Sequence, residues 1–256
     1  MSSSSTSLTA LLTGATAGFG LAIARELVRR GHRVIATGRR QERLDALQRE
    51  LGSASCLPRV LDVRDRAACQ ALVDGLPAEW ANVDVLVNNA GLGLGLDPAQ
   101  SASLDEWDTM VDTNVKGLMY LTRMCLPGMI ARGRGHIVNL GSIAAFVPYP
   151  GGNVYGATKA FVDQFSLNLR ADLFGTPVRV TNLEPGLCGG TEFSEVRFRG
   201  DKERATKVYE GAQPILPEDI AETVLWVISL PSHVNINGIQ MMPVCQSFPA
   251  LAVKRL

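Results

Sequence analysis

The sequence lacks several features that would mark other classes of protein. Lysine plus arginine equals aspartate plus glutamate, at 25 each, so no charge excess points to nucleic acid or to an anionic membrane. No apolar run is long enough to span a bilayer, and no basic segment followed by an apolar core indicates a signal peptide. We therefore expect a cytoplasmic protein with neither nucleic-acid nor membrane partners.

Metal-site, disulfide and hydrolase motifs are missing as well. The five cysteines are scattered and never form C-x-x-C, which predicts reduced thiols. His32, His136 and His233 have no metal-ligand spacing, so we expect no metal. The sequence also has no G-x-S-x-G elbow of an acyl hydrolase and no phosphate loop of a nucleotide triphosphatase.

Short β-rich runs alternate with amphipathic helical stretches along the whole chain, a pattern typical of a parallel sheet with helices on both faces. The pattern predicts a single α/β domain over residues 8–256, a Rossmann-type, doubly wound, parallel seven-stranded sheet, after a flexible serine-rich tail at residues 1–7. The expected strands are 8–13, 33–38, 57–61, 83–87, 136–140, 178–183 and 239–244; the expected helices are 18–30, 41–51, one that Asp65 caps, 103–132, 152–174 and 217–230.

Residues 186–213 interrupt this alternation with glycine and charged residues. We interpret this segment, called the lid from here on, as a mobile loop. It contains Arg197 and Arg199, either of which could hold an anionic substrate group as the lid closes and excludes water. The alternatives are that both arginines are solvated, or that Gln246 and Ser247 take this role.

Tyr155 and Lys159 place a phenol and an ammonium four residues apart, on one face of a predicted helix. The ordinary pKa of tyrosine is about 10, and a neighbouring cation lowers it by favouring the phenolate. Lowering the pKa by ~2 to 3 pH units needs roughly 3 to 4 kcal/mol. One exposed charge does not supply this, so we expect a positively charged cofactor or a further hydrogen-bond donor to contribute.

Two further features favour hydride transfer to or from a carbonyl. Ser142 ends an apolar run upstream of Tyr155. Near the N-terminus, Gly14, Gly18 and Gly20 form a turn between a predicted strand and a predicted helix. Such a turn lets a pyrophosphate approach the backbone at a helix N-terminus. The glycine spacing alone is a weak signal, because glycine turns between strands and helices are common.

The second predicted strand ends in Thr37-Gly38-Arg39-Arg40, with no acid where an NAD enzyme would hold the ribose hydroxyls. Two guanidinium groups suit a 2′-phosphate, so Arg39 and Arg40 favour NADP. A solvated basic turn is the alternative. Asp62 could accept a hydrogen bond from an adenine amine, or it could serve only as a cap or turn residue.

Taken in order, these motifs resemble those of the short-chain dehydrogenase/reductase family. The others are Asn88-Asn89-Ala90-Gly91, Asn114 and Pro185-Gly186. The resemblance extends over about residues 8–244. Within the family it is closest to the bacterial NADP-dependent 3-hydroxy acid dehydrogenases, also called L-allo-threonine or serine dehydrogenases, through residues 36–44, 151–161, 184–193 and 241–243.

The resemblance implies a role for each catalytic candidate. Tyr155 would be the general base in alcohol oxidation and the general acid in reduction. Lys159 would lower the pKa of Tyr155 and bind the nicotinamide ribose. Ser142 would hold the reacting oxygen, and Asn114 would anchor a water that links Lys159 to solvent.

The resemblance also implies a set of cofactor contacts and a homotetramer. Asn89 and its loop would border the adenosine ribose, and the start of the lid would cradle the nicotinamide and pyrophosphate. The expected NADP-binding residues are Gly14, Thr16, Gly18, Phe19, Gly20, Arg39, Arg40, Asp62, Val63, Asn89, Ala90, Gly91, Tyr155, Lys159, Pro185, Gly186, Leu187, Gly190, Thr191 and Phe193.

The sequence thus predicts an NADP-dependent oxidoreductase for the 3-hydroxyl of small hydroxy acids, such as serine, L-allo-threonine, 3-hydroxypropionate or 3-hydroxyisobutyrate, or for the matching semialdehyde or ketone. Ser142, Tyr155 and Arg197 are the expected substrate contacts. A broad-range NADPH carbonyl reductase and a non-catalytic NADP-sensing protein are the alternatives, and the intact Ser142, Tyr155 and Lys159 argue against the second.

Overall fold

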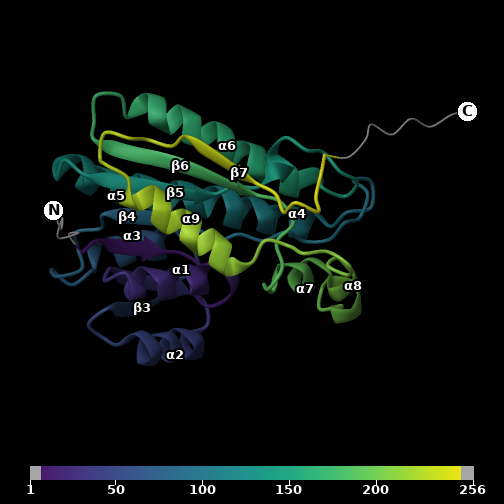
Figure 1. The fold of residues 1–256 in the computed structure, drawn as a ribbon, viewed down its shortest axis with the longest axis horizontal. Coiled ribbons are helices and arrows are strands. Elements are labelled where there is room, and N and C mark those ends of the chain that lie inside the picture. Colours follow the sequence, from purple (N-terminus) through teal and green to yellow (C-terminus); the bar gives the residue numbers. More distant parts are fainter. Residues whose placement is uncertain (1–6, 249–256) are drawn as a thin grey trace, which may run out of the picture.

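The computed structural model describes residues 7–248, in which seven strands form one all-parallel sheet (Figure 1). The strand order is β3-β2-β1-β4-β5-β6-β7, and β1 pairs with both β2 and β4. The chain therefore starts in the middle and winds outward in both directions, which confirms the predicted doubly wound sheet. The strands are β1 (Thr9–Leu12), β2 (Arg33–Gly38), β3 (Cys56–Val60), β4 (Val85–Asn88), β5 (Gly135–Leu140), β6 (Val178–Pro185) and β7 (Gly238–Met241).

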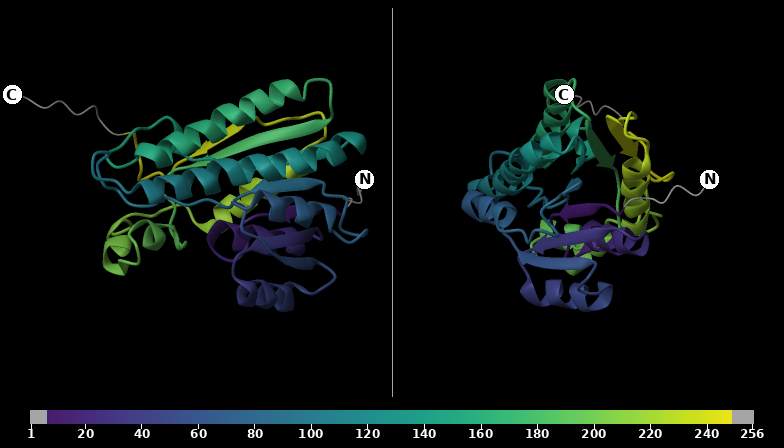
Figure 2. Two further views of the ribbon diagram at one scale, coloured as in Figure 1. Left: turned by 180° about the vertical axis from the view of Figure 1, so that it is seen from behind. Right: turned by 90° about the vertical axis from the view of Figure 1, so that its left-hand side faces the viewer.

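Helices cover both faces of this sheet (Figure 2). They are α1 (Gly18–Arg29), α2 (Gln41–Leu51), α3 (Arg66–Asp74), α4 (Leu104–Val111), α5 (Leu118–Ala131), α6 (Asn153–Asp172) and α9 (Pro217–Ser229), with two short helices in the lid. No helix between residues 7 and 248 combines the length and apolarity that a membrane crossing requires.

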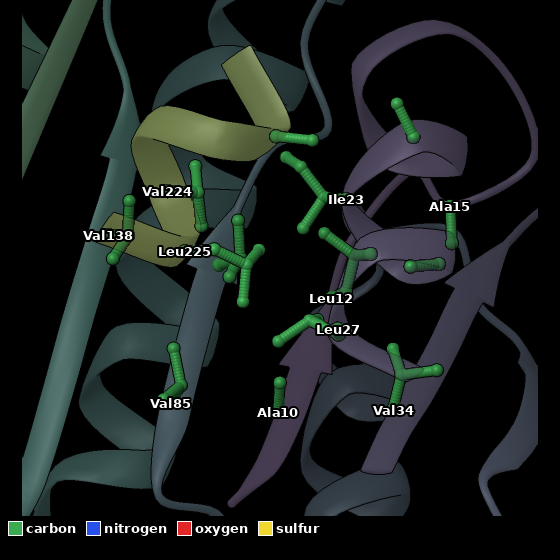
Figure 3. Packing of buried hydrophobic residues seen from close by; sticks show 14 of the residues in the cluster. Ala10, Leu12, Ala15, Ile23, Leu27, Val34, Val85, Val138, Val224 and Leu225 are labelled. Carbon is green, nitrogen blue, oxygen red and sulfur yellow. The ribbon is translucent and has the colours of Figure 1, made fainter. Parts of the chain in front are cut away.

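The alternating side chains of β1 supply both layers of the core. Ala10 and Leu12 pack on one face with Ile23 of α1 and Val224 of α9, as Figure 3 shows. Leu11 points to the other face, where it joins residues of α3, α5 and α6 in a second cluster. Successive residues of a strand face opposite sides, so a strand with helices on both sides must be apolar throughout. All four residues of β1 are buried accordingly.

The helix expected over residues 103–132 is interrupted. Ser103 caps α4 by accepting a hydrogen bond from Glu106 N, as the sequence predicts. The α-helical pattern then gives way to a π-helical turn at Asp112–Gly117 before α5 begins. Hydrophobic periodicity does not reveal such a turn, because it adds a residue without ending the helix.

The lid is more regular than predicted. It contains α7 (Phe193–Arg197) and α8 (Lys202–Lys207), and Figure 1 shows both helices protruding beyond the helix-covered sheet. Asp201 caps α8 by accepting a hydrogen bond from Arg204 N. The segment expected as a loop thus contains two short helices, and its glycines lie before, between and after them while most of its charged residues lie within them.

Candidate active site

The candidate site lies at the carboxyl edge of the sheet, where the parallel strands β4, β5 and β6 end. Open parallel sheets bind ligands at this edge, where the direction of winding reverses. Ser142 follows β5, Pro185 ends β6, and α6 carries Tyr155 and Lys159 alongside. The fold therefore brings the three predicted catalytic side chains to one edge.

Hydrogen bonds to the backbone fix Ser142 and Lys159. The Ser142 hydroxyl caps a single 3-10 turn by accepting from Ala144 N at 3.1 Å, and it donates to the Pro185 carbonyl at 3.3 Å. The Lys159 ammonium donates to the Leu140 carbonyl at 2.7 Å. Both side chains are buried, so these bonds keep polar groups satisfied and hold them in one place.

Tyr155 is buried between these residues and the lid. Burial raises the pKa of Tyr155 to about 12, although the positive charge of Arg197 and a hydrogen bond with Ser142 oppose the shift. We predicted that Lys159 lowers this pKa. Among the protein's own charges the one that does so is Arg197, and burial outweighs it. The expectation that Tyr155 needs further stabilisation of its phenolate therefore agrees with its surroundings.

The pKa of Lys159 also differs from its ordinary value. Burial alone lowers the pKa of Lys159 to about 8. Its nitrogen lies 5.8 Å from the centroid of the Tyr155 ring. The ammonium is therefore close to losing its proton just above neutral pH, which suits a lysine that takes part in proton movement.

The π-helical turn positions Asn114. Its amide nitrogen donates to the Leu92 carbonyl at 2.8 Å and to the Thr158 hydroxyl at 3.0 Å, and its oxygen accepts from Leu92 N at 2.9 Å. Asn114 thus joins α6 to the loop after β4. Both amide hydrogens are engaged, so the water-anchoring role that the resemblance implies stays a prediction.

The glycine turn has the shape of a phosphate cradle. Gly14 and Gly18 have positive φ angles of 68° and 50°, which favour glycine. A Cβ at Gly20 would overlap the Gly14 carbonyl oxygen and lie 2.7 Å from the Asn89 amide. Asn89 holds the turn by donating to the Thr13 carbonyl at 2.7 Å. The bare backbone at the start of α1 fits a pyrophosphate.

Arg40 lies next to this turn, and the 2′-phosphate contact predicted for Arg39 and Arg40 stays a prediction. Arg40 donates to the Thr16 hydroxyl at 3.0 Å, and Arg43 from the first turn of α2 approaches from the other side. Both arginines contact the carboxylate of Glu192 in the lid. Arg39 is exposed. Sequence reasoning missed Arg43 because it lies inside a charged helix with no distinctive spacing.

Asp62 follows β3, next to Arg64 and near the charge of Arg39. Its carboxylate accepts from Arg64 at 2.6 Å. This hydrogen bond, with a smaller contribution from the Arg39 charge, lowers the pKa of Asp62. An adenine contact for Asp62 remains a prediction. The pairing with Arg64, two residues on, fits the alternative role of Asp62 as a turn residue.

The lid closes over Tyr155. The rings of Phe193 and Tyr155 are 5.6 Å apart, and the guanidinium of Arg197 lies 4.7 Å from the Tyr155 ring centroid. Arg197 donates to the Tyr149 hydroxyl at 2.7 Å. Its buried Nε has no hydrogen-bond partner among residues 7–248. Arg197 therefore brings an unsatisfied cationic donor to the catalytic tyrosine candidate.

Arg199 points elsewhere. Its guanidinium pairs with Asp97 and Glu106, each at 2.6 Å, on the outer side of the loop after β4. Of Arg197 and Arg199, only Arg197 contacts Tyr155. Sequence reasoning also missed Tyr149 and Glu192, because both reach the site through contacts between distant parts of the chain.

The remaining cofactor candidates line the same edge. A Cβ at Gly18 would lie 3.1 Å from the Thr191 side chain, so the start of the lid lies against the glycine turn. Leu187 N donates to the Gln246 amide oxygen at 2.7 Å, which ties the start of the lid to the segment after β7. Among residues 7–248, no group of three or more His, Cys, Asp or Glu side chains could hold a metal.

With this geometry in place, comparison with known families decides the class. The short chain dehydrogenase model matches residues 8–202 of the chain. The chain belongs to this family. Its all-parallel sheet flanked by helices is therefore that of a short chain dehydrogenase.

Similar proteins narrow the family further. The chain is 64% identical over 245 residues to the NADP-dependent 3-hydroxy acid dehydrogenase YdfG of Salmonella typhi, covering 96% of this chain and 98% of the relative. It is 52% identical to the serine 3-dehydrogenase of Rhizobium radiobacter, with the same coverage. A solved closed form of serine dehydrogenase complexed with NADP+ matches with a TM-score of 0.96 at 60% identity, covering 97% of this chain and 100% of that one.

The chain is an NADP-dependent dehydrogenase, and its residues fit that cofactor. The bare glycine turn and the N-terminus of α1 suit the pyrophosphate, and the paired Arg40 and Arg43 suit the 2′-phosphate. No acid follows β2 to favour NAD instead.

Proposed function

We propose that the enzyme oxidises the 3-hydroxyl of small 3-hydroxy acids, of the serine, L-allo-threonine, 3-hydroxypropionate or 3-hydroxyisobutyrate type, or reduces the matching semialdehyde or ketone. The observation that carries this proposal is Arg197, a half-buried guanidinium 4.7 Å from the Tyr155 ring with an unpartnered Nε. The names of the similar proteins support it.

A substrate carboxylate needs such a partner. A carboxylate that leaves water without a cation or several donors loses its binding energy to desolvation. Lys159 already donates to the Leu140 carbonyl. Arg197 donates to Tyr149, and its Nε is covered and without a partner among residues 7–248. A carboxylate that reaches Nε when the lid opens would place the neighbouring carbons next to Tyr155.

The chain's own residues would then move the proton. NADP supplies the hydride acceptor in oxidation and, when reduced, the donor in reduction. In oxidation the Tyr155 phenolate takes the hydroxyl proton of the substrate, and in reduction the Tyr155 phenol returns a proton to the carbonyl oxygen. The Ser142 hydroxyl turns from the Pro185 carbonyl to donate to the reacting oxygen and holds it beside Tyr155. Lys159, whose pKa burial lowers to about 8, passes the proton toward solvent.

The test is to replace Arg197 with Ala. Efficiency on a 3-hydroxy acid should fall at least ~10-fold, as expected when a charge-assisted hydrogen bond is lost. Efficiency on a neutral alcohol of similar size should fall less, because it has no carboxylate to bind and loses only the Arg197 charge that favours the Tyr155 phenolate. NADPH absorbance measures both reactions.

Arg199→Ala is the matched control, since it removes the same charge from the same lid without touching the site. It should affect both substrates equally and weakly. If Arg197→Ala lowered both activities by the same factor, the carboxylate contact would be wrong. A wild type that prefers neutral ketones would favour a broad-range carbonyl reductase.

We also propose a homotetramer in the cytoplasm. Apolar side chains stand exposed on three helices, namely Met119 on α5, Leu167 on α6 and Trp226 on α9. Exposed apolar surfaces of this kind often mark contacts between subunits. Sedimentation equilibrium would measure the mass of the assembly, and a monomer would contradict the proposal.

A further inference from the structure

Glu192 carries a carboxylate from the lid to the arginines beside the glycine turn. Its Oε2 lies 2.9 Å from Arg40 Nη1, and its Oε1 lies 2.6 Å from Arg43 Nη1. Each carboxylate oxygen therefore has its own guanidinium. This contact is the one by which the start of α7 reaches the end of β2 and the start of α2.

Arg40 is one of the two arginines that the sequence predicts for the 2′-phosphate of NADP, and the shared Glu192 contact adds Arg43 to that proposed subsite. The Thr16 hydroxyl accepts from Arg40, which fixes this side chain over the glycine turn. A carboxylate and a phosphate use the same donors of a guanidinium, because both accept through two oxygens in one plane. Glu192 thus occupies the position of an anionic ligand.

We propose that Glu192 is an internal anion in the 2′-phosphate subsite, which the 2′-phosphate of NADP displaces when it binds. This inference rests on the proposed role of Arg40 and Arg43. A nucleotide that has a 2′-hydroxyl in place of the phosphate leaves the Glu192 pairs intact. Glu192 therefore opposes the phosphate and acts as a residue that sets cofactor affinity.

The position of Glu192 connects this competition to the lid. Its neighbour Thr191 approaches Gly18, and its other neighbour Phe193 packs on Tyr155. Release of the carboxylate frees one end of α7, while Arg199 still holds the other end through Asp97 and Glu106. Binding of the phosphate thus changes the contacts of the lid segment that covers Tyr155.

The expected energy is modest. The side chains of Arg40, Arg43 and Glu192 are 40%, 47% and 42% exposed, so solvent screens their attraction. Removing the carboxylate should tighten the binding of a 2′-phosphate about 3- to 10-fold, the range for one or two partly exposed ion pairs.

Calorimetry with two nucleotides that lack nicotinamide tests this without measuring activity. The probes are 2′,5′-ADP, which carries the phosphate, and 5′-ADP, which does not. Glu192→Gln should bind 2′,5′-ADP about 3- to 10-fold tighter than wild type and should bind 5′-ADP equally well. Glu195→Gln is the matched control, because it removes a nearby carboxylate of α7 whose ion-pair partner within residues 7–248 is Lys202, at 3.8 Å.

The outcomes separate the inference from its premise. If wild type prefers 2′,5′-ADP and Glu192→Gln binds it no tighter than Glu195→Gln does, the role of Glu192 is wrong while the subsite stands. If wild type shows no preference for 2′,5′-ADP over 5′-ADP, or if the double variant Arg40→Ala and Arg43→Ala keeps that preference, the proposed subsite is wrong. The proposed role of Glu192 is then wrong as well.

Hydrogen exchange provides a second readout. In wild type, 2′,5′-ADP should speed amide exchange around residues 192–197, and 5′-ADP should not. In Glu192→Gln this exchange should already be fast without nucleotide. Protection of these amides by 2′,5′-ADP would overturn the displacement.

Discussion

Ser142, Lys159 and Asn114 form the floor of the site, and different interactions hold this floor and the lid in place. On the floor, Ser142, Lys159 and Asn114 are buried and bind backbone carbonyls at the ends of strands and in the loop after β4. In the lid, Glu192 and Arg199 reach their neighbours through partly exposed ion pairs. The floor is therefore set by folding, whereas the lid is set by charges that salt or a ligand can replace.

This difference assigns different tasks to the two regions. A proton transfer needs groups fixed within hydrogen-bond distance, which buried neutral bonds provide. A lid must open for each substrate, and partly exposed ion pairs of small net energy allow that. Arg197 is the exception, since it belongs to the lid yet lies against Tyr155.

The largest effect should come from the floor. Tyr155→Phe removes only the hydroxyl, so turnover should fall by at least ~100-fold while NADPH affinity stays close to wild type, because general acid–base catalysis contributes this much. Steady-state rates and fluorescence titration of NADPH measure the two quantities. Lys159→Ala should lose both turnover and affinity. Residual turnover above about a tenth of wild type in Tyr155→Phe would remove Tyr155 from the proton step.

The next effect lies where the lid meets the cofactor. Replacing Arg40 and Arg43 together with Ala should raise the KM for NADP by ~10- to 100-fold, as one lost charge-assisted contact predicts. The KM for NAD should hardly change. Arg39→Ala is the control, since Arg39 is exposed beside the pair. If Arg39→Ala raised the KM for NADP as much, Arg39 would bind the 2′-phosphate with Arg40, as the sequence alone predicts. If wild type used NADP and NAD equally well, neither pair of arginines would select NADP.

The smallest effect is a titration. Because burial raises the pKa of Tyr155 to about 12, the phenol should persist above the pKa of an ordinary tyrosine. Near-ultraviolet absorbance of the cofactor-free wild type and of Tyr155→Phe should therefore show no difference in phenolate up to pH about 10. Bound NADP+ should move the Tyr155 phenolate to lower pH, so that oxidation speeds up and reduction slows as pH rises through the new value. Phenolate from Tyr155 below pH about 10 without cofactor would show that burial does not dominate.

The sequence predicted the floor better than the lid. The alternation of strand and helix patterns is local, and the seven-stranded parallel sheet that it predicts is confirmed. The Tyr155–Lys159 spacing is also local, and both residues lie on the helix α6. Most strand boundaries moved by one or two residues; for example, the strand expected at 83–87 is Val85–Asn88. The predicted tail and the predicted end of the domain include residues 1–6 and 249–256, which lie outside the described part of the chain.

The lid could not be predicted in this way. Glu192 meets Arg40 across 152 positions of the chain, and Tyr149 meets Arg197 across 48. No local spacing encodes such pairs, because they depend on how the lid closes over the sheet. The charge of the lid segment singled out Arg197 and Arg199 in the sequence, but only the structure separates the two.

The π-helical turn at Asp112–Gly117 amounts to a surplus residue in an otherwise regular helix. A shortening by one residue there would restore the ordinary hydrogen-bond ladder and rotate Asn114 away from Leu92 and Thr158. An unbroken hydrogen-bond ladder and an amide placed between Leu92 and Thr158 are therefore alternative arrangements of this segment, and the chain adopts the second.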